Sequence, residues 1–375
     1  MNIRALVWIV VIVVVVGGGW LIYTHKGGSG STETGPIKIG FIGPLTGDAA
    51  SIGTAARAGA ELAVGEINAA GGVNGRQIEV DYQDGQCSAQ PATGAATKFF
   101  NDGVTAILGG LCSTETAAFA PAAMQHKVVT ESYCSSAPSL SSTGKYFFRD
   151  YPSDAYQGKF GADYAYNTLS ARNVAVISHI SDYGTGIKNV FETEFRALGG
   201  TIVDDEALLQ TATDYRTELA KIKSAKPDYI YAAMYPAGAT AMAKQMKELG
   251  ITTKILGGDA WGDTKLFADV QSLGLDIKYT TAKENSSDAF KAKILAKIGG
   301  QEVPECAAQA YDGTYILANA LKSAGTSDPD AIANAMRATK YDGVAGHYEF
   351  DQNGDVTNAN YVVMRIADGK STLVQ

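Results

Sequence analysis

The sequence has few of the residues and motifs on which catalysis and metal binding usually depend. It contains no G-x-S-x-G nucleophile elbow, no G-x-x-x-x-G-K-S/T phosphate loop and no H-E-x-x-H zinc motif. Its four histidines are scattered, and its four cysteines show no C-x-x-C spacing that would bind zinc. We therefore expect no catalytic residue, no metal and no cofactor.

Charged residues are also scarce, and no stretch of the chain is strongly basic. Only 19% of the 375 residues are charged, and the formal net charge is −8. A protein that binds nucleic acid needs a positively charged surface, so we expect no nucleic-acid partner. The hydrophobic share of 46% indicates a well-packed protein, and the length is too great for one compact core. Two lobes are therefore expected.

A long hydrophobic run occurs at the N-terminus, from Leu6 to Tyr23. As a helix, these eighteen residues would span roughly 27 Å, close to the thickness of the hydrocarbon layer of a membrane. Residues 1–26 are thus either an uncleaved signal anchor, which would be a transmembrane segment, or a cleaved signal peptide. We favour the anchor because no A-x-A cleavage site follows the run. Residues 27–36 are rich in glycine and serine and indicate a flexible tether.

From Ile37 onward, short apolar runs alternate with helical patterns in two series. Strands that alternate with helices through short turns form parallel sheets covered on both faces, so we expect an α/β fold with two doubly wound lobes. The expected strands lie at 37–42, 77–82, 104–108 and 128–130, then at 174–177, 201–203, 229–234, 255–256 and 361–366. The expected helices lie around 56–67 and at 89–102, 116–125, 188–198, 215–224, 239–249, 286–298 and 307–323.

The stretch that begins at Gly109-Gly110 lies where an expected strand turns into an expected helix. Backbone N–H groups at a helix start have no partner inside the helix, and they carry partial positive charge that favours an anion such as a carboxylate. Ser113 and Thr114 can add hydroxyl donors to this site. The alternative is that Ser113 only caps the helix.

Several motifs follow one another in a fixed order from Ile37 to the C-terminus. They begin with the run IKIGFIGPLTGDAASIGTAARAGAELAVGEINAAGGVNGRQIEVDYQDGQC and continue with GGLCST, VTESYCSSAPSLS, FFRDYPSDAYQG, SDYGTG and QAYDGTY. In this order the chain resembles the periplasmic leucine/isoleucine/valine-binding proteins of ABC importers. The resemblance implies the type I periplasmic-binding-protein fold, in which two Rossmann-like lobes are joined by three crossovers and close on a ligand by a hinge. The first lobe would comprise residues 37–150 and 283–349, and the second residues 151–282 and 350–375.

The resemblance also implies a set of ligand-binding residues. The ligand carboxylate would bind Ser113, Ser136 and the helix start near Thr114, and the ligand ammonium would bind the Cys134 carbonyl. The remaining implied contacts are Tyr183 and Asp259 at the amine and Tyr235 as an aromatic wall. The chain departs from the family pattern at Ile52, where tyrosine is frequent, and at Cys306, where a phenylalanine can pack on the ligand side chain.

Disulfides are the expected state of the four cysteines, because a segment for export precedes them. The family often links the pair that corresponds to Cys87 and Cys112. Cys134 and Cys306 both map to the wall of the cleft, which makes them a possible second pair.

The function implied by the resemblance is that of the substrate-binding receptor of an ABC importer for amino acids. The ligand would be a free amino acid with a branched-chain or other mostly uncharged side chain, delivered to ABC permease subunits. The location would be the periplasm, with the protein either tethered to the inner membrane or secreted after signal cleavage. The alternative is a membrane-anchored sensor of the same fold for amides, urea or aromatic acids.

Overall fold

The structure is a computed structural model that describes residues 35–374. Residues 36–375 form one compact unit. The hydrophobic run Leu6–Tyr23 lies outside the described residues, so its role as anchor or signal stays a prediction. Within residues 35–374, we find no helix that is both long and apolar enough to cross a membrane.

The first sheet is entirely parallel, as the apolar runs of the first series predict. Its five strands are arranged in the order β2-β1-β3-β4-β5. Six of the seven residues of β1 are buried, which is typical of a strand covered on both faces. The bounds are β1 (Ile37–Gly43), β2 (Ile78–Asp84), β3 (Ala106–Leu108), β4 (Val129–Ser132) and β5 (Phe147–Arg149).

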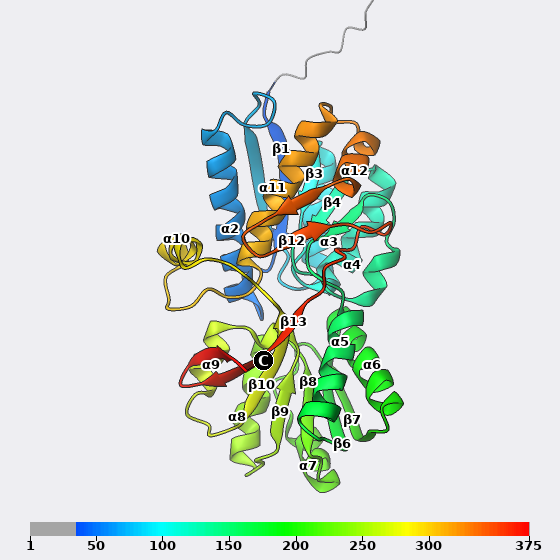
Figure 1. The fold of residues 1–375 in the computed structure, drawn as a ribbon, viewed down its shortest axis with the longest axis vertical. Helices are drawn as coiled ribbons and strands as arrows, with labels where there is room; N and C mark the ends of the chain where they lie inside the picture. Colours follow the sequence, from blue (N-terminus) through cyan, green and yellow to red (C-terminus); the bar gives the residue numbers. More distant parts are fainter. Residues whose placement is uncertain (1–34, 375) are drawn as a thin grey trace, which may run out of the picture. The chain divides into compact units, whose positions relative to one another are not determined.

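The helices around the first sheet come from two distant parts of the chain. In Figure 1 the orange helix α11 lies beside the blue helix α2, and the two are in extensive contact. A Cβ atom at Gly59 of α2 would lie 2.1 Å from the Ala307 carbonyl oxygen, so only glycine permits this close approach. The bounds are α2 (Ala50–Ala69), α3 (Ala89–Asp102), α4 (Ser113–His126), α10 (Asp288–Ile298), α11 (Ala307–Ala324) and α12 (Pro329–Arg337).

The second sheet has seven strands in the order β14-β13-β10-β9-β8-β6-β7. Its first five strands along the chain are parallel, and the last two add an antiparallel edge. The bounds are β6 (Asn173–Ile180), β7 (Thr201–Leu209), β8 (Tyr229–Ala233), β9 (Lys254–Gly257), β10 (Ile277–Ala282), β13 (Tyr361–Ala367) and β14 (Lys370–Leu373). A separate antiparallel pair comprises β11 (Lys340–Asp342) and β12 (His347–Glu349).

The helices of the second series cover this sheet and complete a second α/β lobe. α5 and α6 pack closely against each other. The bounds are α5 (Asp154–Asp163), α6 (Asp182–Ala197), α7 (Arg216–Ala225), α8 (Pro236–Glu248) and α9 (Thr264–Val270), with short helical turns η2 (Tyr164–Thr168) and η3 (Asp259–Trp261). Another short turn, η1 (Pro138–Ser142), lies between β4 and β5 of the first sheet. The two-lobed α/β fold expected from the sequence is confirmed.

The chain passes between the two sheets three times: between β5 and α5, between β10 and α10, and between β12 and β13. Arg149 joins the first of these passages to the third. Its side chain is fully buried, and its Nε lies 2.6 Å from Asp355 Oδ1. The guanidinium also donates to the carbonyls of Ser135 and Ala137 and to the hydroxyl of Ser141. One buried cation thus holds two crossing segments together.

Candidate functional site

The turn from β3 into α4 brings a serine to the edge of the first sheet. Gly109 has φ +147°, and a Cβ atom there would lie 2.4 Å from the Ile42 carbonyl oxygen, so the turn requires glycine. Cys112 is the N-cap, and Ser113 is already the first residue of α4. The alternative in which Ser113 caps the helix is therefore wrong. Its Oγ instead accepts a hydrogen bond of 3.1 Å from the Ala137 N–H.

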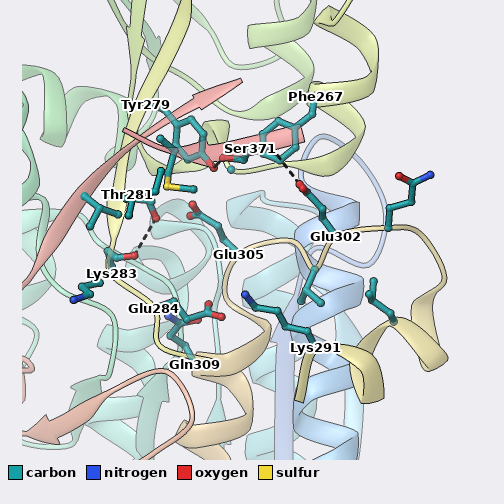
Figure 2. A pocket seen from close by; sticks show the side chains of 18 of the residues that line it. Phe267, Tyr279, Thr281, Lys283, Glu284, Lys291, Glu302, Glu305, Gln309 and Ser371 are labelled. Atoms are coloured by element: carbon teal, nitrogen blue, oxygen red, sulfur yellow. Dashed lines mark hydrogen bonds between the residues drawn. The ribbon is translucent and has the colours of Figure 1, made fainter. Parts of the chain in front are cut away.

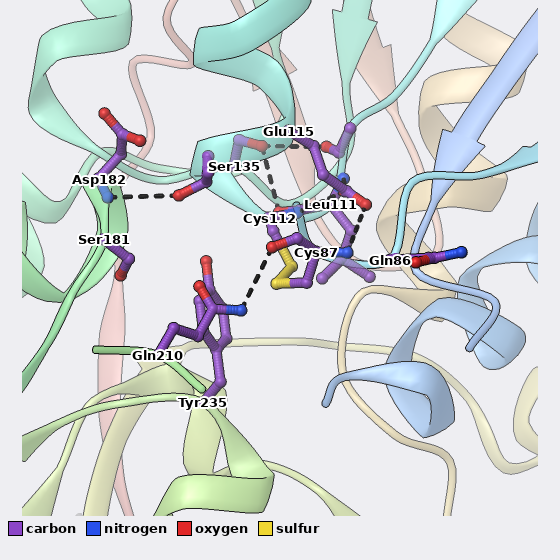
Figure 3. Close-up of a disulfide and its surroundings, with 12 residues drawn as sticks. Gln86, Cys87, Leu111, Cys112, Glu115, Ser135, Ser181, Asp182, Gln210 and Tyr235 are labelled. Carbon is purple, nitrogen blue, oxygen red and sulfur yellow. Dashed lines mark hydrogen bonds between the residues drawn. A yellow bond between two sulfur atoms is a disulfide. The ribbon is translucent and has the colours of Figure 1, made fainter. Parts of the chain in front are cut away.

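Cys87 and Cys112 form a disulfide next to this turn, with their Cα atoms 5.2 Å apart. Figure 3 shows the carboxyl of Glu115 beside the bond. That carboxyl accepts hydrogen bonds from the N–H groups of Cys87 (2.9 Å), Leu111 (3.1 Å) and Cys112 (3.0 Å). Burial raises the pKa of Glu115 to about 7, and the three N–H donors oppose that rise. Bond and carboxyl together fix the loop that carries Ser113.

Removing this disulfide is expected to lower the free energy of unfolding by about 3 kcal/mol, because a closed loop of this length restricts the unfolded chain. The bond spans 25 positions of the sequence. Urea unfolding of the variant Cys87→Ala/Cys112→Ala measures the loss, with the untreated and the reduced wild type as controls. Free thiols at both positions in the untreated wild type, together with an unchanged unfolding midpoint, would contradict the expectation.

A small cavity lies between residues of the first and second lobes. Its volume is about 20 Å³. Most of the residues implied by the family resemblance lie around it. They come from the β3–α4 turn, the loop after β4, the start of α6, the N-cap of α8, η3 and the segment before α11. The lining residues are Ile52, Leu111, Ser113, Cys134, Ser136, Tyr183, Tyr235, Asp259, Ala260, Glu305 and Cys306.

The second-lobe side of the cavity presents an acid and two tyrosines. The hydroxyl of Tyr183 donates a 2.7 Å hydrogen bond to Asp259 Oδ1. The rings of Tyr183 and Tyr235 lie 5.2 Å apart between centroids. Asp259 is 5% exposed, and burial raises the pKa of its carboxyl. Burial of a carboxylate costs free energy unless hydrogen-bond donors or a cation pair with it.

The first-lobe side presents hydroxyls and a disulfide. Cys134 and Cys306 are bonded, with their Cα atoms 5.8 Å apart, and both line the cavity. Ser136 Oγ lies 2.9 Å from Asp154 Oδ2. Burial and the nearby Asp259 carboxyl raise the pKa of Asp154 well above its usual range. The Ser136 hydroxyl donates this hydrogen bond to the Asp154 carboxyl.

Thr114 is not among the residues that line the cavity. Its Oγ1 accepts a 3.4 Å hydrogen bond from the N–H of Asp182 at the start of α6. The Thr114 side chain thus contacts the second lobe, and its expected contact with the ligand stays a prediction.

Two acids near the cavity do not appear among the residues expected from the sequence. Asp154 contacts Ser136, and Glu305 lines the cavity next to Cys306. Asp154 begins α5 within a polar stretch of the sequence, and no neighbouring residue indicates that it is buried. The position of Glu305 beside Cys306, where the chain departs from the family pattern, is the signal that could have found it.

Comparison with known proteins shows that the chain is similar to periplasmic binding proteins. A family model described as a periplasmic binding protein matches residues 36–371. A leucine-, isoleucine-, valine-, threonine- and alanine-binding protein of Pseudomonas aeruginosa is 30% identical over 336 residues, 87% of this chain and 89% of that protein.

Solved structures show the same similarity. A leucine-binding protein from Thermotoga maritima has a TM-score of 0.83 at 27% identity, covering 90% of this chain and 98% of that one. A branched-chain amino acid transporter substrate-binding protein from Streptococcus pneumoniae, in complex with isoleucine, has a TM-score of 0.81 at 30% identity, covering 90% and 99%.

Proposed function

The chain belongs to the periplasmic binding protein family and is a substrate-binding receptor of the ABC-importer class rather than an enzyme, and on this premise we propose that it binds a free L-amino acid between its two lobes. The observation that carries the proposal is the convergence of Ser113 and Ser136 from one lobe with Tyr183 and Asp259 from the other on a single cavity. Hydroxyl donors and a buried acid on opposite sides suit the two charges of a zwitterion.

The proposed arrangement follows from those two sides. The ligand carboxylate binds the hydroxyls of Ser113 and Ser136, and the ammonium binds the Asp259 carboxyl and the Cys134 carbonyl. Tyr183 holds Asp259 in place, and the ring of Tyr235 packs against the ligand. The arrangement is tested by whether Asp259→Ala weakens binding of an amino acid more than binding of its des-amino analogue.

The ligand side chain is proposed to be uncharged and of small to medium size. The residues around the cavity include no lysine, arginine or histidine that could pair with an acidic side chain. The isoleucine named with the pneumococcal structure fits this class. The alternative ligands, amides, urea and aromatic acids, carry no ammonium to pair with Asp259.

Hinge motion is proposed to let the ligand in. A cavity of about 20 Å³ is little larger than a single water requires. Ser51 of α2 also donates a hydrogen bond to Asp263, across the boundary between the lobes. The lobes must separate to admit an amino acid and close again for the permease to recognise the complex. The moving bodies are proposed to be residues 37–150 with 283–349 and residues 151–282 with 350–375.

The family implies an extracytoplasmic location. We further propose that the segment Leu6–Tyr23 keeps the protein on the inner membrane, with residues 27–36 as the tether. After cell fractionation, the protein is expected in the membrane fraction, with an intact mass that includes the N-terminal segment. A soluble periplasmic form that begins near Trp20 or Lys26 would show a cleaved signal peptide instead.

A further inference from the structure

Glu305 lies in the wall between the small cavity and a larger one beside it. The larger cavity has a volume of about 580 Å³ and extends between β10, α10 and the segment before α11. Glu305 lines both cavities. Figure 2 shows its carboxyl turned toward Thr281 of β10. A ligand side chain that leads away from Asp259 along this wall would therefore meet the Glu305 carboxyl.

The local structure makes room for this carboxyl. A Cβ atom at Gly262 would lie 2.1 Å from Glu305 Oε1, so the glycine leaves space that any other residue would fill. The Glu305 N–H also donates a 3.5 Å hydrogen bond to the Gly262 carbonyl. The position of the acid is thus fixed from both its backbone and its side chain.

None of the residues that line the small cavity with Glu305 is a lysine, arginine or histidine. Burial raises the pKa of Glu305, and the nearby negative charge of Asp259 adds to the rise. The hydroxyls of Thr281 and Tyr151 act in the opposite direction. The hydroxyl of Tyr235, which is 4% exposed and also lines the small cavity, has no hydrogen-bond partner within the described residues. Glu305 and the Tyr235 hydroxyl can therefore form hydrogen bonds beyond those proposed for the ligand carboxylate and ammonium.

We propose that Glu305 is a specificity-determining residue that makes the receptor prefer amino acids with a hydroxyl or amide side chain over aliphatic amino acids of the same shape. The proposal rests on amino-acid binding in the small cavity, as proposed above. A hydroxyl or amide both donates and accepts hydrogen bonds, so it satisfies Glu305 in either protonation state. An aliphatic side chain would desolvate the carboxyl further without offering it a hydrogen bond, and sites built around a polar group reject such ligands strongly.

Two pairs of ligands of matched shape test the proposal by titration calorimetry: threonine against valine, and asparagine against leucine. The wild type is expected to bind the polar member of each pair about tenfold or more tightly. Glu305→Met removes the polar group at similar volume and is expected to abolish or reverse the preference. Glu305→Gln keeps a hydrogen-bonding group and is expected to retain it.

The control is Glu302→Gln. Glu302 lines the larger cavity but not the small one, and its carboxyl accepts a 3.4 Å hydrogen bond from the Ser371 N–H. This variant is expected to keep the preference of the wild type. A wild type that binds valine and leucine at least as tightly as threonine and asparagine would overturn the proposal, as would an unchanged preference in a folded Glu305→Met variant. Absence of binding for all four amino acids would instead contradict the proposed function itself.

Discussion

Replacing Asp259 with alanine is expected to weaken binding of the amino acid by about 2–5 kcal/mol, because the buried ligand ammonium would lose the carboxyl proposed to pair with it. Asp259 is 5% exposed, and its carboxyl accepts a 2.7 Å hydrogen bond from the Tyr183 hydroxyl. A des-amino analogue carries the same carboxylate and side chain but no ammonium. The same substitution should therefore cost that analogue much less.

Titration calorimetry on wild type and Asp259→Ala, with an amino acid and its des-amino analogue, measures both losses. Asp102→Ala serves as the control, because it removes one negative charge from an exposed position outside the cavity. Equal losses for the two ligands, or no loss for the amino acid, would rule out the zwitterion model.

Replacing Arg149 with alanine is expected to lower the free energy of unfolding by about 3–5 kcal/mol. The substitution removes the 2.6 Å ion pair with Asp355, whose side chain is 13% exposed in the intact protein, and leaves that carboxylate without its cation. It also removes the donor for the carbonyls of Ser135 and Ala137. Since Ser136 lies between these two residues, the variant should loosen the first-lobe side of the cavity as well.

Chemical unfolding of Arg149→Ala measures the loss of stability. The matched control is Lys145→Ala, which breaks an ion pair with Asp330 whose side chains are 60% and 53% exposed. An exposed pair contributes about 0–1 kcal/mol, so the control should unfold nearly as the wild type does. A loss for Arg149→Ala as small as that of the control would show that this cation does not hold the crossing segments.

The sequence predicts most strands of the two sheets because buried parallel strands are short apolar runs between glycine-rich turns. Among the elements that it does not predict are β10 and α5. The sequence of β10, Ile277–Ala282, alternates polar and apolar residues, a pattern typical of a strand at the edge of a sheet. The strand nevertheless lies inside the sheet, between β9 and β13. The sequence of α5, Asp154–Asp163, contains two glycines and little apolar periodicity, so its helical pattern is weak. Packing against α6 stabilises the helical conformation of α5, for which the local helix propensity is low.

The candidate site divides in a similar way. Ser113 and Asp259 belong to motifs that can be recognised along the chain, and the structure brings them to one cavity. Thr114 belongs to the same motif, but helix geometry turns it toward Asp182. For Glu305 the sequence offers only its position beside Cys306, because its closeness to Asp259 arises only when the segment before α11 folds back onto the cleft. The sequence pattern cannot predict contacts between segments that are distant along the chain.

The central claim, that the cleft binds a free amino acid, is tested most directly by thermal unfolding of the compact unit from Pro36 onward in the presence of candidate ligands. A ligand at one hundred times its dissociation constant stabilises the folded state by about 2.7 kcal/mol, which a thermal shift detects. The account predicts that uncharged L-amino acids raise the unfolding temperature, whereas urea, simple amides and benzoate do not. Stabilisation by amides or aromatic acids alone, with no effect of any amino acid, would contradict it.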